Sequence, residues 1–127
     1  MYLLDTQLVV WFALEPSRLS RKAVSLVGPR DSPVSFSLAT LWEVAIKTSL
    51  DRPGFQVDPS ALREGLLTQG LRQVDIRAEH VAVVGRLPWV HRDPFDRLLV
   101  AQALVEGLTL LTSDRTLARY GKMVKVV

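Results

Sequence analysis

Five carboxylates stand where a folded chain rarely places charge. Each lies inside or at the end of an apolar segment: Asp5, Glu43, Asp93, Asp96 and Asp114. Charged side chains are seldom buried unless they are paired or bind a metal. The chain has two histidines and no cysteine. Because Mg²⁺ and Mn²⁺ take oxygen ligands and need neither imidazole nor thiolate, these acids indicate a site for a hard cation.

Two of these acids follow apolar, strand-like runs. Asp5 comes after such a run near the start of the sequence, and Asp114 comes after another near its end. Both have a simpler interpretation as well. Asp5 could cap the next helix, expected over about 6–14, and Asp114 could be a turn residue or cap a short helix over 115–120. We expect Thr6 to cap the first of these helices, which would leave Asp5 free for chemistry.

The other three acids belong to predicted helices. Glu43 lies at the edge of the apolar stripe of a helix capped by Ser37, where pairing with Lys47 is the simpler interpretation. Asp93 opens Asp-Pro-Phe-Asp, a good helix start with this residue as the N-cap. Asp96 shares a helix face with apolar residues. We therefore assign Asp93 mainly to capping and Asp96 mainly to a metal.

The elements that must position these acids alternate between strands and helices. Strands are expected near 2–5, 33–36, 72–76, 109–112 and 123–127. Helices are expected over about 6–14, over a segment that ends near 27, and over 38–50, 58–70, 78–87, 93–107 and 115–120. A loop is expected over 51–54. This alternation predicts an α/β fold, a three-layer α/β/α sandwich with a central, mainly parallel sheet. Sites in such sheets form beyond the carboxyl ends of the strands, where Asp5 and Asp114 are expected.

The composition fits one domain over residues 1–127. Hydrophobic residues make up 48% of the chain, which is enough for a core. The absence of cysteine excludes disulfides, zinc fingers, iron–sulfur clusters and a thiol nucleophile, and is compatible with the cytosol. No apolar stretch approaches the roughly 20 residues that span a bilayer, and the N-terminus does not resemble a signal peptide. We therefore expect a cytoplasmic protein with no membrane contact.

The net charge gives a weaker indication of a partner. It is +3, and would be +7 without the four acids assigned to the site. A basic surface rich in Arg favours contact with phosphates, although an ordinary soluble surface is the alternative interpretation. Arg97 and Arg115 stand beside the acids in sequence, so we expect them to bind phosphates of a substrate.

The order of the acids in these contexts resembles the PIN-domain family, and most closely the VapC-type toxins of bacterial toxin–antitoxin pairs. Four segments carry the resemblance: Leu3–Thr6, Trp42–Lys47, Asp96–Ala103 and Leu111–Asp114. They are similar to the family's opening strand with its first acid, the helix with its glutamate, the third motif and the last motif. Many relatives have a further acid and an aromatic residue after the last motif, where this chain has Leu117 and Ala118.

The resemblance implies a PIN-like domain and a Mg²⁺-dependent endoribonuclease, with Mn²⁺ as the other candidate ion. Its catalytic residues would be Asp5, Glu43, Asp96 and Asp114. Asp5 and Asp96 would hold a first ion, with Asp114 as a further ligand. Glu43 would ligate a second ion or orient the attacking water as general base. The family also implies an RNA substrate, a cognate antitoxin and a homodimer, with apolar helix residues near 9–14 as one place for either protein contact.

One alternative function stays open. A non-catalytic RNA-binding or protein-interaction module on the same fold would keep the basic surface and show no metal-dependent cleavage. Three aromatic side chains have minor assignments: His91 to loop packing rather than general-acid catalysis, His80 to a helix surface, and Trp89 to packing or to stacking on an unpaired base.

Overall fold

A computed structural model of the chain describes residues 1–29, 33–50 and 53–127. Its strands are β1 (Tyr2–Leu4), β2 (Val34–Ser37), β3 (Arg72–Val74), β4 (Thr109–Thr112) and β5 (Val124–Val126). Its α-helices are α1 (Thr6–Leu14), α2 (Arg21–Val27), α3 (Leu38–Ser49), α4 (Pro59–Thr68), α5 (Ala78–Val84) and α6 (Pro94–Glu106). Two short 3-10 helices are η1 (Pro16–Arg18) and η2 (Arg115–Tyr120).

Most expected elements are confirmed to within a few residues. The strand expected over 72–76 ends at Val74, and the helix expected over 78–87 ends at Val84. Residues 51 and 52 of the expected loop lie outside the described residues. None of the helices in the described ranges is long and apolar enough to cross a bilayer.

The five strands form one parallel sheet in the order β3-β2-β1-β4-β5. Strand β1 lies at its centre, where Tyr2 pairs with Val34 of β2 on one side and with Thr109 of β4 on the other. In chain order, β2 and β3 lie on one side of β1, and the next strand, β4, lies on its other side. Ligand sites in such sheets form where the strand order changes side in this way, beyond the carboxyl ends of the central strands.

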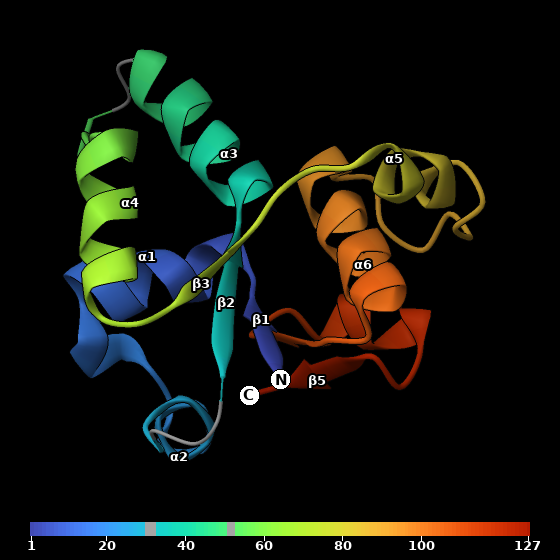
Figure 1. Cartoon of the computed structure of the whole chain (residues 1–127), viewed down its shortest axis with the longest axis horizontal. Helices are drawn as coiled ribbons and strands as arrows, with labels where there is room; N and C mark the ends of the chain where they lie inside the picture. The colour runs from blue at the N-terminus through green and yellow to red at the C-terminus, as the bar shows by residue number, and fades with distance from the viewer. Residues whose placement is uncertain (30–32, 51–52) are drawn as a thin grey trace.

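Helices cover both faces of the sheet, which confirms the predicted three-layer sandwich. Figure 1 shows α5 and α6 on one side of the strands and α1 and α4 on the other. Successive residues of a strand point to opposite faces. Leu3 and Leu110 accordingly belong to the core beneath α6, whereas Leu4 and Leu111 belong to the core formed with α1, α3 and α4.

Side-chain caps set where several helices begin. Ser37, Asp58 and Asp93 cap α3, α4 and α6, as the sequence predicts. The expectation that Thr6 caps α1 is wrong, because Asp5 does so by accepting a hydrogen bond from the backbone N–H of Leu8 at 2.9 Å. Asp5 therefore has a structural role at the helix start in addition to any role in chemistry.

Candidate active site

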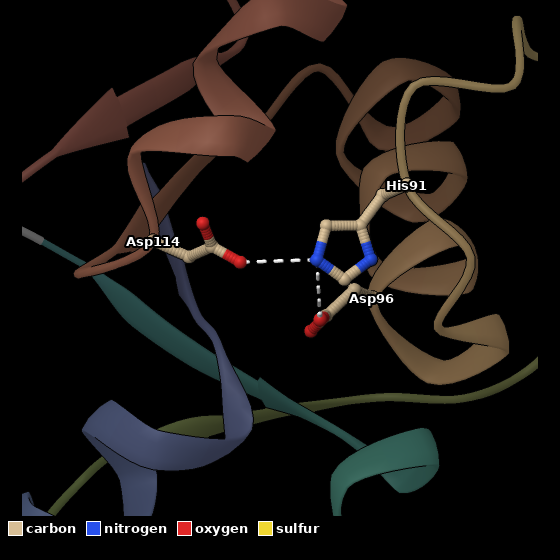
Figure 2. A group of neighbouring side chains, drawn as sticks. All are labelled: His91, Asp96 and Asp114. Carbon is tan, nitrogen blue, oxygen red and sulfur yellow. Dashed lines mark hydrogen bonds and ion pairs between the residues drawn. The ribbon is translucent and has the colours of Figure 1, made fainter.

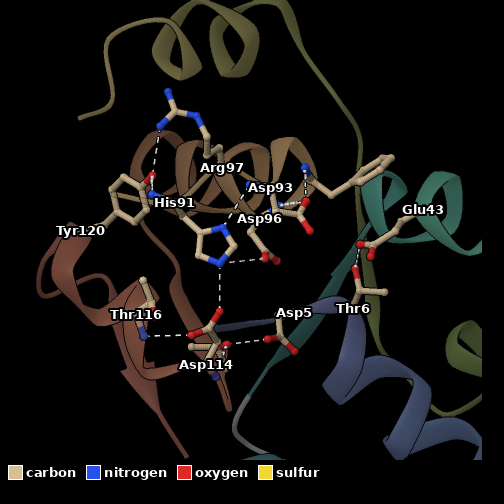
Figure 3. Close-up of polar contacts among 12 residues, drawn as sticks. Asp5, Thr6, Glu43, His91, Asp93, Asp96, Arg97, Asp114, Thr116 and Tyr120 are labelled. Atoms are coloured by element: carbon tan, nitrogen blue, oxygen red, sulfur yellow. Dashed lines mark hydrogen bonds and ion pairs between the residues drawn. The ribbon is translucent and has the colours of Figure 1, made fainter. Parts of the chain in front are cut away.

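The structure brings the four predicted acids to one cavity of about 280 Å³ at the carboxyl end of the sheet. Figure 3 shows their origins. Asp5 follows β1, Asp114 follows β4, Glu43 belongs to α3, and Asp96 lies in the first turn of α6. Asp93 also lines the cavity, but one of its oxygens accepts hydrogen bonds from the backbone N–H groups of residues 95 and 96, which is the capping role expected for it.

The carboxylate of Asp5 is buried and held from two sides. Its Oδ1 accepts from the Leu8 N–H, and its Oδ2 accepts from the hydroxyl of Thr112 at 2.5 Å. Burial raises the pKa of Asp5 to about 6, since the ionised form loses its water. The two hydrogen bonds lower this pKa, and the negative charges of Glu43 and Asp114 raise it. Asp5 is thus a fixed carboxylate in electrostatic contact with its acidic neighbours.

Asp96 shows the larger perturbation. Burial is the first cause that raises its pKa to about 7, and the charges of Asp93, Asp5 and Glu43 raise it further, whereas His91 lowers it. Since no hydrogen bond to its side chain is present to offset these effects in the described residues, the ionised Asp96 is unfavourable in the protein without a cation. The ionised form of a carboxylate in this environment is stabilised by any cation that binds in the cavity.

Glu43 combines the two roles that the sequence left as alternatives. Its Oε1 accepts from the hydroxyl of Thr6 at 2.7 Å, and its Oε2 pairs with the ammonium of Lys47 at 2.8 Å. The glutamate is buried, and both it and Lys47 line the acidic cavity. Pairing with Lys47 therefore does not remove Glu43 from the site. The ion pair with Lys47 holds Oε2 of Glu43 in a fixed position at the cavity wall.

Asp114 is a helix cap and a site residue at the same time. Its Oδ1 accepts from the Thr116 N–H at 2.9 Å, which caps η2, and its Oδ2 lies 3.0 Å from Nε2 of His91. The same Nε2 lies 3.8 Å from Oδ2 of Asp96. Figure 2 shows the imidazole between the two carboxylates. The sequence led us to assign His91 to loop packing. The signal that could have placed it at the site was its position two residues before Asp93, the cap of α6.

Arg97 does not reach the cavity. It is 3% exposed, and its Nη1 donates to the carbonyl of Pro88 and to the hydroxyl of Tyr120, while Nη2 donates to the carbonyl of Val84. Its guanidinium carbon lies 4.0 Å from the ring centre of Trp89. The expectation that Arg97 binds substrate phosphates is therefore wrong, because the side chain is buried and both of its terminal nitrogens donate to groups of the protein.

Two other assigned residues have clear positions. Arg115 is exposed and lines a second cavity next to the acidic one. His80 does not lie on a helix surface as expected. It is fully buried between α5 and α6, with its Nε2 at 2.7 Å from Oε2 of Glu106. Helix α6 covers this side of α5, where its Gln102 and Glu106 contact the ring, and the pattern of α5 alone does not show which of its faces is covered.

The donor set of the cavity fits a hard divalent cation. It consists mainly of carboxylates. The pKa values of Asp5 and Asp96 are raised, in part by the negative charges of neighbouring carboxylates. Lys47 is the one basic side chain lining the cavity within the described residues, and it is paired with Glu43. Among the described residues, atoms of His91, Asp96 and Asp114 of the kinds that ligate metals lie within 4.8 Å of one another. A cation among these groups would relieve the repulsion.

Comparisons with known proteins show the family and the fold of the chain. The sequence pattern of the PIN domain matches residues 2–123. Ribonuclease VapC22 of Mycobacterium tuberculosis is 29% identical over an alignment of 126 positions, and the match covers 91% of this chain and 88% of that protein.

Solved structures are similar over almost the whole chain. The crystal structure of VapBC2 from Rickettsia felis bound to a promoter DNA fragment matches with a TM-score of 0.71 at 17% identity, covering 98% of this chain and 97% of the other. DNA-bound VapBC from Salmonella typhimurium matches with a TM-score of 0.70 at 19% identity, covering 98% and 96%. At these identities the likeness concerns the fold.

Proposed function

The chain belongs to the PIN domain family, and from that premise we propose that it is a metal-dependent endoribonuclease, the toxin of a toxin–antitoxin pair. One observation carries the proposal: Asp5, Glu43, Asp96 and Asp114 come from four separate elements and line one cavity. The relative named as a ribonuclease and the structural neighbours from toxin–antitoxin complexes support it. We place its action in the cytoplasm, as the sequence suggests.

The carboxylates would hold the cation. Asp5 and Asp96 are the proposed ligands of a first ion because burial and neighbouring negative charges raise the pKa of both carboxyl groups, and Asp114 is a further ligand. When bound, Mg²⁺ or Mn²⁺ supplies Lewis-acid stabilisation of the charge that develops on the phosphodiester and lowers the pKa of water. The hydroxyl of Thr112 fixes the orientation of Asp5 for this purpose.

Glu43 is the proposed general base or a ligand of a second ion. Thr6 and Lys47 hold its two oxygens by contacts of 2.7 and 2.8 Å, so the carboxylate has a fixed position at the cavity wall. In the first role it accepts the proton of the attacking water at one of these oxygens. The proton can then leave to solvent at the edge of the cavity, where Lys47 is partly exposed.

A basic cavity next to the acidic one is the proposed site for neighbouring phosphates of the RNA. It has a volume of about 640 Å³, and its lining includes Lys22, Ser113 and Arg115, of which Ser113 also lines the acidic cavity. No acidic side chain lines it among the described residues. Because exposed Arg and Lys side chains bind phosphate without base specificity, this cavity would position the strand and leave cleavage to the carboxylates.

The proposed protein partners need apolar surface. Of the residues near 9–14, Val9 is fully buried and belongs to the core, whereas Leu14 is 53% exposed. Leu14 lines a cavity of about 250 Å³ between α1 and α4, together with Ala61 and Leu62. We propose this groove for the apolar segment of an antitoxin. A homodimer remains part of the proposal, and sedimentation of the purified protein would test it.

Cleavage of a labelled RNA by the purified protein tests the function. We expect new RNA ends in the presence of Mg²⁺ or Mn²⁺ and none with a chelator. Asp96→Asn should abolish cleavage, and Asp93→Asn is the matched control because it changes a neighbouring acid whose capping role asparagine can take over. Cleavage that persists in chelator would refute the proposal. Salt-dependent RNA binding without any cleavage would instead support the non-catalytic binding module.

A further inference from the structure

His91 is held in a defined orientation beside Asp96 and Asp114, two residues that line the acidic cavity, as Figure 3 shows. Its backbone N–H donates to the hydroxyl of Tyr120 at 3.1 Å. Its ring Nδ1 accepts from the backbone N–H of Asp93 at 3.1 Å, and its Nε2 lies 3.0 Å from Oδ2 of Asp114. Each nitrogen of the residue therefore has a separate partner.

The loop that carries His91 is also fixed. Arg97 donates to the carbonyls of Pro88 and Val84, one within and one before this loop, and to the same Tyr120 hydroxyl that accepts from His91. A buried guanidinium with several carbonyl partners restricts the loop to one position relative to α6. Such support is what a side chain needs to act on a substrate with defined geometry.

These contacts determine which ring nitrogen carries the hydrogen. A neutral imidazole has one N–H and one lone pair. The Asp93 N–H occupies the lone pair of Nδ1, so the hydrogen is on Nε2, which donates to Asp114. A nitrogen that carries a hydrogen has no lone pair for a metal. His91 therefore cannot ligate a cation through Nε2 in this arrangement, although it lies close to the oxygens of Asp96 and Asp114.

We propose that His91 is a substrate-facing hydrogen-bond donor of the site and not a metal ligand. In the free protein the Nε2–H of His91 donates to Oδ2 of Asp114. With this carboxylate oxygen engaged in holding a cation, the Nε2–H of His91 would be free to donate to a phosphate oxygen of the RNA. This role rests on the proposed nuclease function, whereas the ring tautomer can be measured without any substrate.

Nitrogen-15 NMR of the histidine rings tests the ligand question. The chain has two histidines, and His80 serves as an internal reference. Its Nδ1 likewise accepts a backbone N–H, from Arg77 at 3.0 Å, and its Nε2 pairs with Glu106 away from the cavity. We expect both rings in the Nε2–H form before and after addition of Mg²⁺. Loss of the hydrogen from Nε2 of His91 when Mg²⁺ binds would overturn the proposal.

Two substitutions test the contact with substrate. His91→Ala should lower kcat by about 10²-fold, the size of effect typical for removing one donor to a developing oxyanion. His91→Gln should restore part of the rate because its amide can donate from about the position of Nε2, whereas His91→Asn, which ends at the position of Nδ1, should not. Calorimetry with Mg²⁺ alone should give similar affinities for these three variants and the wild type, and a large loss for Asp96→Asn.

The outcomes separate the two proposals. Unchanged cleavage by His91→Ala, or equal rates for the Gln and Asn variants, would overturn the donor role. A loss of Mg²⁺ affinity in His91→Ala and His91→Gln as large as that in Asp96→Asn would show that His91 is a ligand. If the wild type cleaves no RNA, the nuclease function fails and the donor role fails with it, but the NMR spectra still decide whether His91 binds the cation.

Discussion

Asp96→Asn should stabilise the metal-free protein at neutral and alkaline pH while it removes activity. The reason is the raised pKa of Asp96, which burial and the charges of Asp93 and Asp5 bring from an ordinary 3.8 to about 7. Below pH 3.8 the residue is neutral in both the folded and the unfolded chain. As the pH rises, the unfolded chain ionises first, and the free energy of unfolding falls until the folded pKa is reached.

The magnitude follows from the two pKa values. They differ by about 3, and at 1.36 kcal/mol for each unit the ionised Asp96 lowers the free energy of unfolding by about 4 kcal/mol above pH 7. Asparagine carries no charge and avoids this cost. It also loses the favourable interaction of a carboxylate with the N-terminus of α6, about 0.3–1 kcal/mol. We therefore expect a net stabilisation of about 3 kcal/mol at pH 8.

Urea unfolding in the presence of a chelator, at pH values from 4 to 9, measures this effect. The difference between Asp96→Asn and the wild type should be small near pH 4, grow between pH 4 and 7, and then stay constant. Addition of Mg²⁺ should stabilise the wild type, since the ion binds only the folded chain, and should have little effect on the variant. Asp93→Asn keeps the cap of α6 but removes one of the charges that raise the pKa of Asp96, so its effect on stability should have the same direction and be smaller.

Two results would refute this reasoning. If Asp96→Asn is less stable than the wild type at pH 8 without metal, the carboxylate contributes a favourable contact that outweighs its burial. If the stability difference does not change between pH 4 and 8, Asp96 has an ordinary pKa, and the repulsion that we relate to cation binding is absent.

Three further outcomes are expected. Asp5→Asn should abolish RNA cleavage while circular dichroism shows a folded protein, and cleavage at saturating Mg²⁺ would contradict the role of Asp5. RNA affinity should fall as salt rises, and Arg115→Ala should reduce the slope of log affinity against log salt by about 0.7, the value for one phosphate contact on a single strand; an unchanged slope would remove Arg115 from the interface. Arg97→Ala should lower the free energy of unfolding by at least about 3 kcal/mol because it leaves buried carbonyls unpaired, and Arg97→Lys should not restore it, since one ammonium cannot replace the fork of a guanidinium. Urea unfolding measures both variants, and a cost below about 1 kcal/mol would contradict the role assigned to this side chain.

Local chemistry made much of the fold predictable. The dipeptides Asp58-Pro59 and Asp93-Pro94 start α4 and α6 as expected. Gly107 ends α6 in the left-handed region, with φ at 68°. The apolar run of β4 has the predicted bounds. These signals depend on a few neighbouring residues, which is why one sequence sufficed to find them.

Contacts between distant segments were not predictable in the same way. Thr112 donates to Asp5 across 107 positions of the sequence, and no local pattern indicates that pairing. Arg97 was assigned to phosphate because of its neighbour Asp96, but the helix turns its side chain toward the carbonyl of Pro88. His91 was assigned to packing because the sequence does not show that the loop before α6 lies against the end of β4, where Asp114 stands.

The position of β1 between β2 and β4 has a consequence for the order of events during synthesis. Asp5 and Glu43 leave the ribosome long before Asp114 exists, and they meet the C-terminal acids only after β4 pairs with β1. Pairings of such large sequence separation form late, because they require the closure of a long loop. On the proposed function, an unfinished chain on its own ribosome, surrounded by RNA, therefore lacks the complete set of carboxylates and stays inactive until its last strands are in place.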